Sequence, residues 1–439
     1  MRGMRAAARI EPEELGATLL SFVFVLTLMA AYYILRPIRD AMSSDWSDAQ
    51  LSALFTATFL FSLLAVAGYG LACSRVRFRR LVPGVYVAFA VSFVLFYGLA
   101  TSGDGPQWVR KAFYVWVSVF SLFHVSVFWS YMADVFRRDQ AQRLFGFIAA
   151  GASIGAILGP ALAVTLVGLL GPSRLILVSA VLLLIPVGII GFLEAGRTGA
   201  VGGGQSADVR TAIGGNPLAG FSLFFRSPYL LGVGLFIFLY TAISTFVYFE
   251  LKNLLVGLDE GTRVQIWGAM DLAVNVLAIV TAMFGTSRLT TRFGLTTTLA
   301  VVPMLIVAGM LVLAISPMIG VVVGLQIVRR AGNYAVTRPG REMLFTVVDR
   351  ETRFKAKSVI DIVVYRGGDA VTAWSFTALT AALGLSLGAV AIVGAMLAAL
   401  WATVAILLGR GYERRSRAPR APGDSCSEGV GVGPAMTKE

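Results

Sequence analysis

The chain has 439 residues, of which 57% are hydrophobic and 14% are charged, and its mean hydropathy is +0.78. Soluble domains carry about 25% charged residues, so this composition indicates an integral membrane protein. The apolar runs are continuous rather than alternating, which argues against a membrane β-barrel. Two cysteines and one histidine offer neither a zinc site nor a Ser/His/Asp triad. We therefore expect no enzyme, no catalytic residues, no metal and no cofactor.

Apolar runs of about 20 residues, the length that crosses a bilayer core, recur along the whole sequence. They predict twelve transmembrane helices, near 16–35, 51–72, 81–101, 109–133, 143–170, 174–194, 229–249, 264–285, 295–315, 317–336, 357–383 and 386–409. The first run ends in RPIRD and not in a small-residue cleavage pattern, so we expect it to remain as the first helix.

The net charge of +13 comes from basic residues at the ends of loops, a distribution that does not indicate nucleic-acid binding. With the N-terminus inside, 27 of the 37 Lys and Arg fall in inside loops or termini, 7 fall outside and 3 lie within helices. This positive-inside asymmetry predicts a multi-pass protein of the bacterial inner membrane with both termini in the cytoplasm.

A Gly-rich polar stretch, EAGRTGAVGGGQSADVRTAIGGNP, divides the helices six and six. We expect a cytoplasmic N-terminus (1–15), an N-terminal half (16–194), a cytoplasmic linker (195–228), a C-terminal half (229–409) and a disordered basic cytoplasmic tail (410–439). Twelve helices in two near-equal halves are typical of the all-α major facilitator architecture.

Charges at bilayer depth are costly, so a helix that keeps one generally faces a cavity or a partner. The stretch VIDIVVYRGGDAVTAW places Asp361, Tyr365, Arg366 and Asp369 on one arc of about 140°. An Arg366 to Asp369 salt bridge would only hold helices together. Alternatively, the two residues form a cavity-lining pair that opens during transport.

Two adjacent arginines, Arg329 and Arg330, lie about a dozen residues into the tenth helix. We expect at least one to anchor an anionic group, because guanidinium matches the oxygens of phosphate and carboxylate. Pairing of the other with Asp361 or Asp369 is compatible with this role. Asn333 is a further candidate for substrate binding.

Charges near the ends of other helices have two interpretations. Arg36, Arg39 and Asp40 lie at the outer end of the first helix, where they either snorkel to the interface or act in binding or gating. Asp134 precedes the inside loop FRRDQAQR and is expected to form a gate salt bridge. His124 lies among apolar residues, which favours a packed histidine over a proton relay.

The seventh and eighth helices carry further polar candidates. Tyr240 and Tyr248 either satisfy neighbouring polar groups or stack on a planar substrate. Asp271 is a candidate for coupling or gating. In the fifth helix, Gly155 and Gly159 share a spacing of four, which favours close helix packing.

The segment Arg338–Ala370, RPGREMLFTVVDRETRFKAKSVIDIVVYRGGDA, resembles the nucleotide transporter family, the ATP:ADP antiporters of plastids and intracellular bacteria. The residues that carry this resemblance are Lys355 and Lys357 of KAK, the pattern of Ile360, Asp361 and Val363, and the pair Arg39 and Asp40. Gly146, Gly155, Gly159 and Pro160 fit the fifth-helix motif of major facilitator antiporters without its trailing glycine pair.

This resemblance implies a major facilitator fold, obligate counter-exchange and a central cationic site for phosphates. The chain departs from the family where nucleotide carriers tend to have Lys and it has Asp369. It is therefore expected to be a divergent bacterial member of the family, whose substrate need not be ATP or ADP.

The leading hypothesis is a secondary active transporter that works by alternating access on an anionic small molecule, by resemblance a nucleotide. The alternatives are a proton-coupled transporter of another solute, with Asp369 or Asp271 as proton carrier, and a non-transporting membrane scaffold or receptor. We expect a monomer in the lipid bilayer, with no nucleic-acid partner.

Overall fold

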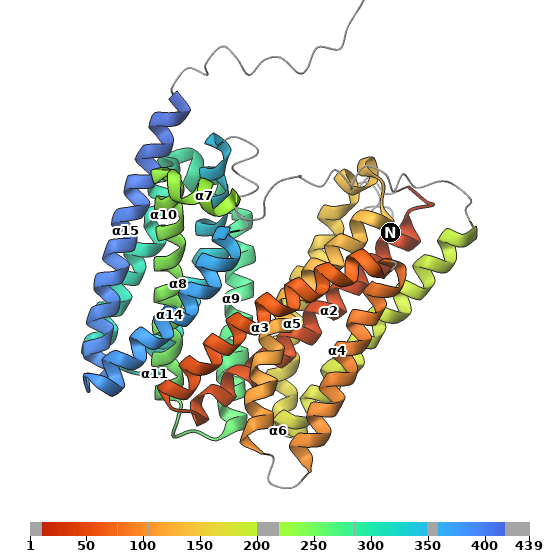
Figure 1. Cartoon of the computed structure of the whole chain (residues 1–439), viewed down its shortest axis with the longest axis horizontal. Helices are drawn as coiled ribbons and strands as arrows, with labels where there is room; N and C mark the ends of the chain where they lie inside the picture. The colour runs from red at the N-terminus through yellow and green to blue at the C-terminus, as the bar shows by residue number, and fades with distance from the viewer. Residues whose placement is uncertain are drawn as a thin grey trace, which may run out of the picture.

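The computed structural model describes residues 11–76, 78–102, 106–199, 219–284, 286–348 and 359–417, and within them all regular structure is helical (Figure 1). The helices of the first half are α2 (Leu15–Met42), α3 (Asp48–Arg75), α4 (Phe78–Thr101), α5 (Gln107–Val135) and α6 (Arg138–Gly199). Those of the second half are α7 (Ala219–Arg226), α8 (Pro228–Leu254), α9 (Glu260–Phe284), α10 (Thr286–Ile315), α11 (Ile319–Gly332), α12 (Arg338–Leu344), α14 (Tyr365–Thr377) and α15 (Leu387–Arg417).

Twelve membrane crossings can be traced through these residues. Nine described helices are long and apolar enough to cross a membrane. One of them, α6, supplies two crossings because it turns at Gly171, whose φ of 75° is not helical. Two further crossings are assembled from shorter pieces joined by π-helical turns. One is α11, η2 (Asn333–Thr337) and α12, and the other is η4 (Val359–Val364), α14 and η5 (Ala378–Ala382).

The predicted fold class is therefore confirmed, while some helix ends differ from the prediction. α2 runs past residue 35 to Met42, with Pro37 inside it. The apolar run stops at Arg36 because the following charges face a cavity instead of lipid. α15 continues past residue 409 to Arg417. Residues 200–218 of the predicted linker and 418–439 of the predicted tail lie outside the described residues.

The start of α2 and the end of α15 lie at the same end of the molecule, here called the N-side face; the opposite end is the far face (Figure 1). Large apolar side chains cover the outer surface between the two faces, among them Leu64, Phe192 and Leu407. Such exposure suits hydrocarbon and would be a liability in water. Because a helix satisfies its own backbone hydrogen bonds, it can present this surface to lipid.

The two halves come together toward the far face and diverge toward the N-side face (Figure 1). Ion pairs cross between the halves at the far face, and the six residues that make them are called the far-face gate. They are Asp45, Asp48 and Arg110 of the first half and Lys252, Glu260 and Arg263 of the second. Nitrogen to oxygen distances in these pairs are 2.5 to 3.0 Å.

Glycines on α6 determine how closely α2 can approach it. A Cβ atom added to Gly159 would lie 2.6 Å from the carbonyl oxygen of Ala30 and 2.7 Å from Cβ of Tyr33. A Cβ atom at Gly155 would collide with the carbonyl oxygen of Leu26. Because Arg36 and Arg39 lie on the same α2 helix, this contact also sets the position of the charged residues.

Replacing Gly159 with alanine is expected to destabilise the protein by about 1–3 kcal/mol, the usual cost of overpacking. The measurement is the apparent melting temperature of the detergent-purified protein. Gly146→Ala, on the same helix, is the matched control, because a Cβ atom there meets nothing within 4 Å. Equal melting temperatures for the two variants would contradict the packing role of Gly159.

Candidate functional site

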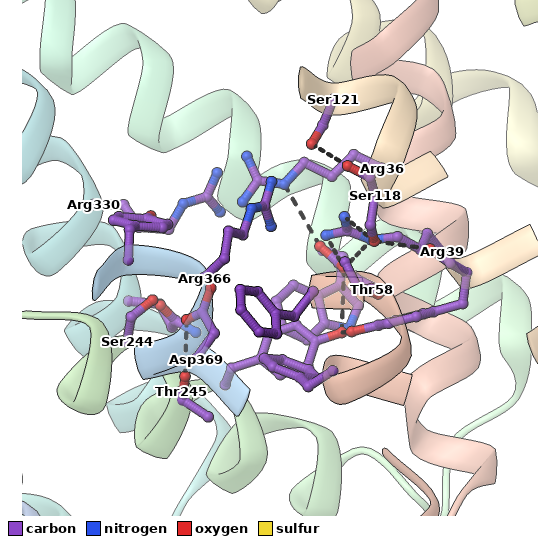
Figure 2. Close-up of a pocket in the computed structure, with 18 of the residues that line it drawn as sticks. Arg36, Arg39, Thr58, Ser118, Ser121, Ser244, Thr245, Arg330, Arg366 and Asp369 are labelled. Carbon is purple, nitrogen blue, oxygen red and sulfur yellow. Dashed lines mark hydrogen bonds and ion pairs between the residues drawn. The ribbon is translucent and has the colours of Figure 1, made fainter. Parts of the chain in front are cut away.

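A cavity of about 250 Å³ lies between the two halves (Figure 2). It is bounded by α2, α3 and α5 of the first half and by α8, α9, α11, η2 and α14 of the second. Its charged lining residues are Arg36, Arg39, Arg329, Arg330 and Arg366, together with Asp40 and Asp369. Five arginines against two aspartates give the cavity a cationic lining.

Arg39 is held in place by neighbours from two helices. Its Nε donates to Oδ1 of Asp40 at 2.8 Å, and its Nη1 donates to Oγ of Ser118 at 3.2 Å. The guanidinium lies 5.4 Å from the ring centroid of Tyr114. These contacts place Arg39 inside the helix bundle and not at the lipid interface, where a snorkelling arginine would lie.

A buried carboxylate links the two halves at this depth. Asp271 of α9 forms an ion pair with Arg330 of α11, with Oδ1 2.5 Å from Nη1, and Arg36 of α2 lies 3.7 Å from its other oxygen. Arg36 also lies 3.6 Å from Asp40, one turn along the same helix. Arg36 is therefore shared between a carboxylate of its own half and one of the other half, so a relative movement of the halves changes its partners.

Two arginines of the second half have no carboxylate partner among the described residues. Arg329 donates to Oε1 of Gln326 at 2.5 Å and to the hydroxyl of Tyr240 at 3.4 Å. Tyr240 is buried behind Arg329 and does not line the cavity. For Arg366, the described part of the chain shows neither a hydrogen bond nor an ion pair. In Figure 2 the side chains of Arg36, Arg330 and Arg366 point toward one another across the cavity.

Asp369 lines the same cavity from α14. Its Oδ1 accepts from Oγ1 of Thr245 at 3.2 Å (Figure 2). The internal salt bridge between Arg366 and Asp369 that the sequence allowed is not formed in this conformation. Both side chains are therefore available to a ligand in the cavity.

Aromatic side chains complete the cavity. Those that line it are Tyr32, Phe55, Phe59, Tyr114, Tyr248, Trp267, Tyr334 and Tyr365. The hydroxyl of Tyr248 donates to Oδ1 of Asp40 at 3.2 Å and lies 3.2 Å from the hydroxyl of Tyr114. Since Tyr248 belongs to the second half, it joins the two halves beside the charged residues. The only histidine of the chain, His124, packs behind the cavity by stacking on Tyr32, with ring centroids 4.4 Å apart.

Most of the predicted site residues meet at this cavity. Its lining includes Arg39, Asp40, Tyr248, Arg329, Arg330, Arg366 and Asp369, with Asp271 directly behind two of the arginines. The structure places Asn333 in η2 and Asp134, exposed, near the N-side end of α5, both outside the lining. Asp361 lies in η4, and its side chain is outside the described residues.

The sequence interpretation missed Gln326 and the far-face gate, and it named Arg36 only in the group with Arg39 and Asp40, without an ion-pair partner. The first helix was expected to end at residue 35, although the spacing of four between Arg36 and Asp40 indicates an ion pair along a helix. Gln326 lies three residues before Arg329, a spacing that places both on one face. The residues of the far-face gate lie in or beside loops, where charged residues are common and do not indicate a functional site.

Residues 18–339 match the model of the Major Facilitator Superfamily. The crystal structure of a bacterial homologue of the human lysosomal transporter Spinster, in an inward-facing and unoccupied conformation, has a TM-score of 0.62 at 14% identity, covering 94% of this chain and 100% of that one. The nucleoside transporter NupG has a TM-score of 0.59 at 12% identity, covering 93% of this chain and 100% of that one.

Comparison with curated proteins gives no match. At such low identity the two solved structures show the fold alone. The family model, in contrast, covers more than half of the sequence and both halves of the helix bundle. The chain therefore belongs to the Major Facilitator Superfamily and is a membrane transporter.

Proposed function

We propose that the chain exchanges small organic anions across the membrane by alternating access, with nucleotides as the leading candidates. The observation that carries this proposal is the pair of arginines, Arg329 and Arg366, that face the cavity without a carboxylate partner among the described residues. Arginine presents donors in a planar fork that fits a phosphate or carboxylate group.

The charge balance of the cavity supports an anionic substrate. Counting Asp271 with the two lining aspartates, three carboxylates face five arginines, so two positive charges are uncompensated. Excess positive charge in a confined, low-dielectric space attracts anions and repels cations. An empty cavity of this kind resists closing to water, which favours exchange of one anion for another over return of the empty carrier.

The aromatic lining supports a substrate with a flat part as well as an anionic part. Tyr334 and Tyr365 lie on the same half as Arg329 and Arg366, and Tyr32 and Tyr114 face them from the other half. A nucleotide combines a planar base with phosphates. The resemblance of Arg338–Ala370 to the ATP:ADP antiporters supports the same substrate class, while Asp369 marks the departure from that family.

The conformation fits one stage of an alternating-access cycle. The far-face gate joins the halves on one side of the cavity, and the helices diverge toward the other side (Figure 1). With the basic loops placed in the cytoplasm, the N-side face is cytoplasmic and this state is inward-facing. Rocking of the halves about the cavity would then expose it to the far side.

Arg329→Gln is expected to weaken anion binding about tenfold to a hundredfold, because a hydrogen bond to a charged group contributes about 1.5–3 kcal/mol. Binding is measured by thermal shift against nucleotides, nucleotide cofactors and small phosphates, and exchange by uptake into preloaded proteoliposomes. Arg292→Gln removes the same charge from the exposed surface and is the matched control. Normal uptake by the Arg329 variant would remove Arg329 from the substrate site.

A second candidate, proton-coupled transport of another solute, is favoured by Asp369, a cavity-lining carboxyl that, among the described residues, accepts a hydrogen bond from Thr245 alone. In that mechanism the carboxyl carries the proton and the solute need not be anionic. Asp271 is less suited to this role, because it is shared by two arginines.

Asp369→Asn separates the two candidates. Under anion exchange the variant is expected to bind anions about tenfold more tightly, because a like charge is removed from the cavity, and to keep exchanging them. Under proton coupling it would lose uptake driven by a pH gradient. Both are measured in the same proteoliposomes, with counter-anion inside in one set and a pH gradient alone in the other.

A further inference from the structure

Glu250 of α8 is a buried acid that the proposed substrate site does not use. Its exposed fraction is 0%, and neither carboxyl oxygen has a hydrogen-bond partner among the residues that the structure describes. It lies one turn before the end of α8 at Leu254, beside the far-face gate and away from the cavity. A carboxyl group in this position must be accounted for, because buried polar groups in proteins are normally paired.

The neighbouring cation is already engaged by other groups. Lys252 donates to the carbonyl oxygen of Trp46 at 2.9 Å and lies 2.6 Å from Oδ1 of Asp48. Residues two apart on a helix point in different directions, so Lys252 does not face Glu250. Asp48 is the charged neighbour whose field acts on Glu250, and it has the same sign.

The other charged side chains that the structure describes on the elements packed against α8 lie elsewhere. Arg329 of α11, and Arg366 and Asp369 of α14, line the central cavity. Asp45 of η1 (Ser43–Asp45) is paired with Arg110 and Arg263. The charges of α7 and α15 lie at the N-side ends of those helices, in Arg226 and in the segment 410–417.

An ionised carboxylate without donor or cation is strongly disfavoured in a dry interior, and a neighbouring carboxylate disfavours it further. The neutral acid is therefore the form of Glu250 that this closed gate accommodates.

Asp48 connects Glu250 to the movement of the gate. Although it belongs to the first half, Asp48 is held by Lys252 and Asn253 of α8 and by Thr380 of η5, at 2.6, 3.2 and 2.7 Å. Asp48 therefore fills the gap between α8 and η5 of the second half, here called the seam. When the halves separate at the far face, Asp48 leaves with the first half and the seam opens to water beside Glu250.

We propose that Glu250 is a proton-binding site linked to the far-face gate: it holds a proton while the gate is closed and releases it to water when the gate opens. The carboxyl O–H bond breaks, the proton passes to a water molecule, and a solvated carboxylate remains; no other group is oxidised, reduced or transferred. The inference rests on the proposed alternating-access cycle, in which the far face opens.

The sign of the pH effect follows from this linkage. The closed gate binds one more proton than the open gate, so acid stabilises the closed gate and alkali favours opening. A solvated glutamic acid has a pKa of about 4.3, so the open gate loses this proton throughout the neutral range. The population of the open gate then rises by at most about tenfold per pH unit.

The test uses the full-length protein in detergent, with Cys73 and Cys426 replaced by serine and Ser52→Cys as reporter. Ser52 is fully buried where α3 meets α14, its hydroxyl 2.8 Å from that of Thr377, so a thiol reagent reaches this position only when the far face opens. Labelling rates are measured from pH 5 to pH 9 without substrate. The Glu250→Gln variant in the same background reports the pH dependence of the thiol reaction itself. At each pH, the labelling rate of the protein with Glu250 is therefore divided by the rate of this variant.

The labelling rate of the protein that retains Glu250, divided by the rate of the Glu250→Gln variant, is expected to rise with pH. The reason is that the Gln variant stays neutral and its gate stays closed. Asp259→Asn is the matched control: Asp259 is an exposed acid of the same face, and asparagine retains its capping interaction with Thr262. It is expected to keep the pH-dependent ratio. If the Gln variant is not monodisperse, Glu250→Met provides the neutral side chain instead.

The proposal would be overturned if the ratio of labelling rates did not change with pH. It would also be overturned if Asp259→Asn lost the pH dependence to the same extent as Glu250→Gln. The assay contains no substrate, so its outcome does not depend on anion binding. A protein that binds no anion can therefore still show the pH-linked gate, and an anion exchanger can lack it.

Discussion

A charged side chain at bilayer depth costs several kcal/mol unless it meets an opposite charge or water. The chain places five arginines at one level of the helix bundle, and their satisfaction determines how the surrounding helices are arranged. Arg36, Arg39 and Arg330 form ion pairs with Asp40 and Asp271. Arg329 and Arg366 have no carboxylate partner among the described residues, and both line the cavity between the two halves.

Close packing and charge placement depend on each other in this arrangement. α2 carries Arg36, Arg39 and Asp40, and it reaches the centre of the molecule because α6 offers it a glycine surface at Gly155 and Gly159. A bulkier α6 would displace α2 and with it Arg36, which pairs with Asp271 across the two halves. The rigid part of each half thus fixes the charges, and the boundary between halves is where their partners change.

Much of this organisation can be predicted from the sequence. Hydropathy alone gives the twelve crossings, because lipid imposes a length and an apolar composition on each of them. The arc of Arg366 and Asp369 follows from helical periodicity, and both residues line the cavity. Gly155 and Gly159 were expected to pack and do so, whereas Gly146, of the same motif, meets nothing.

Other features depend on three-dimensional contacts that periodicity does not encode. Arg330 pairs with Asp271 from another helix, a partner that the sequence interpretation did not name. The π-helical turns of η2 and η4 interrupt the regular 100° step, so the face on which Asn333 lies cannot be read from a uniform helix. Likewise, the seam plugged by Asp48 joins loops and helix ends that are hundreds of residues apart.

The grip on Asp48 has a mechanical consequence. One carboxylate of the first half is clamped by an ammonium, an amide and a hydroxyl, supplied by two elements of the second half. If Asp48 withdrew only partly, all three donors would lose their acceptor and surround an unfilled gap. Conformations with the two halves partly separated at the far face are therefore expected to be poorly populated. In the proposed alternating-access cycle the far side would therefore be either closed or open, with Asp48 and the other residues of the far-face gate limiting leakage through a half-opened carrier.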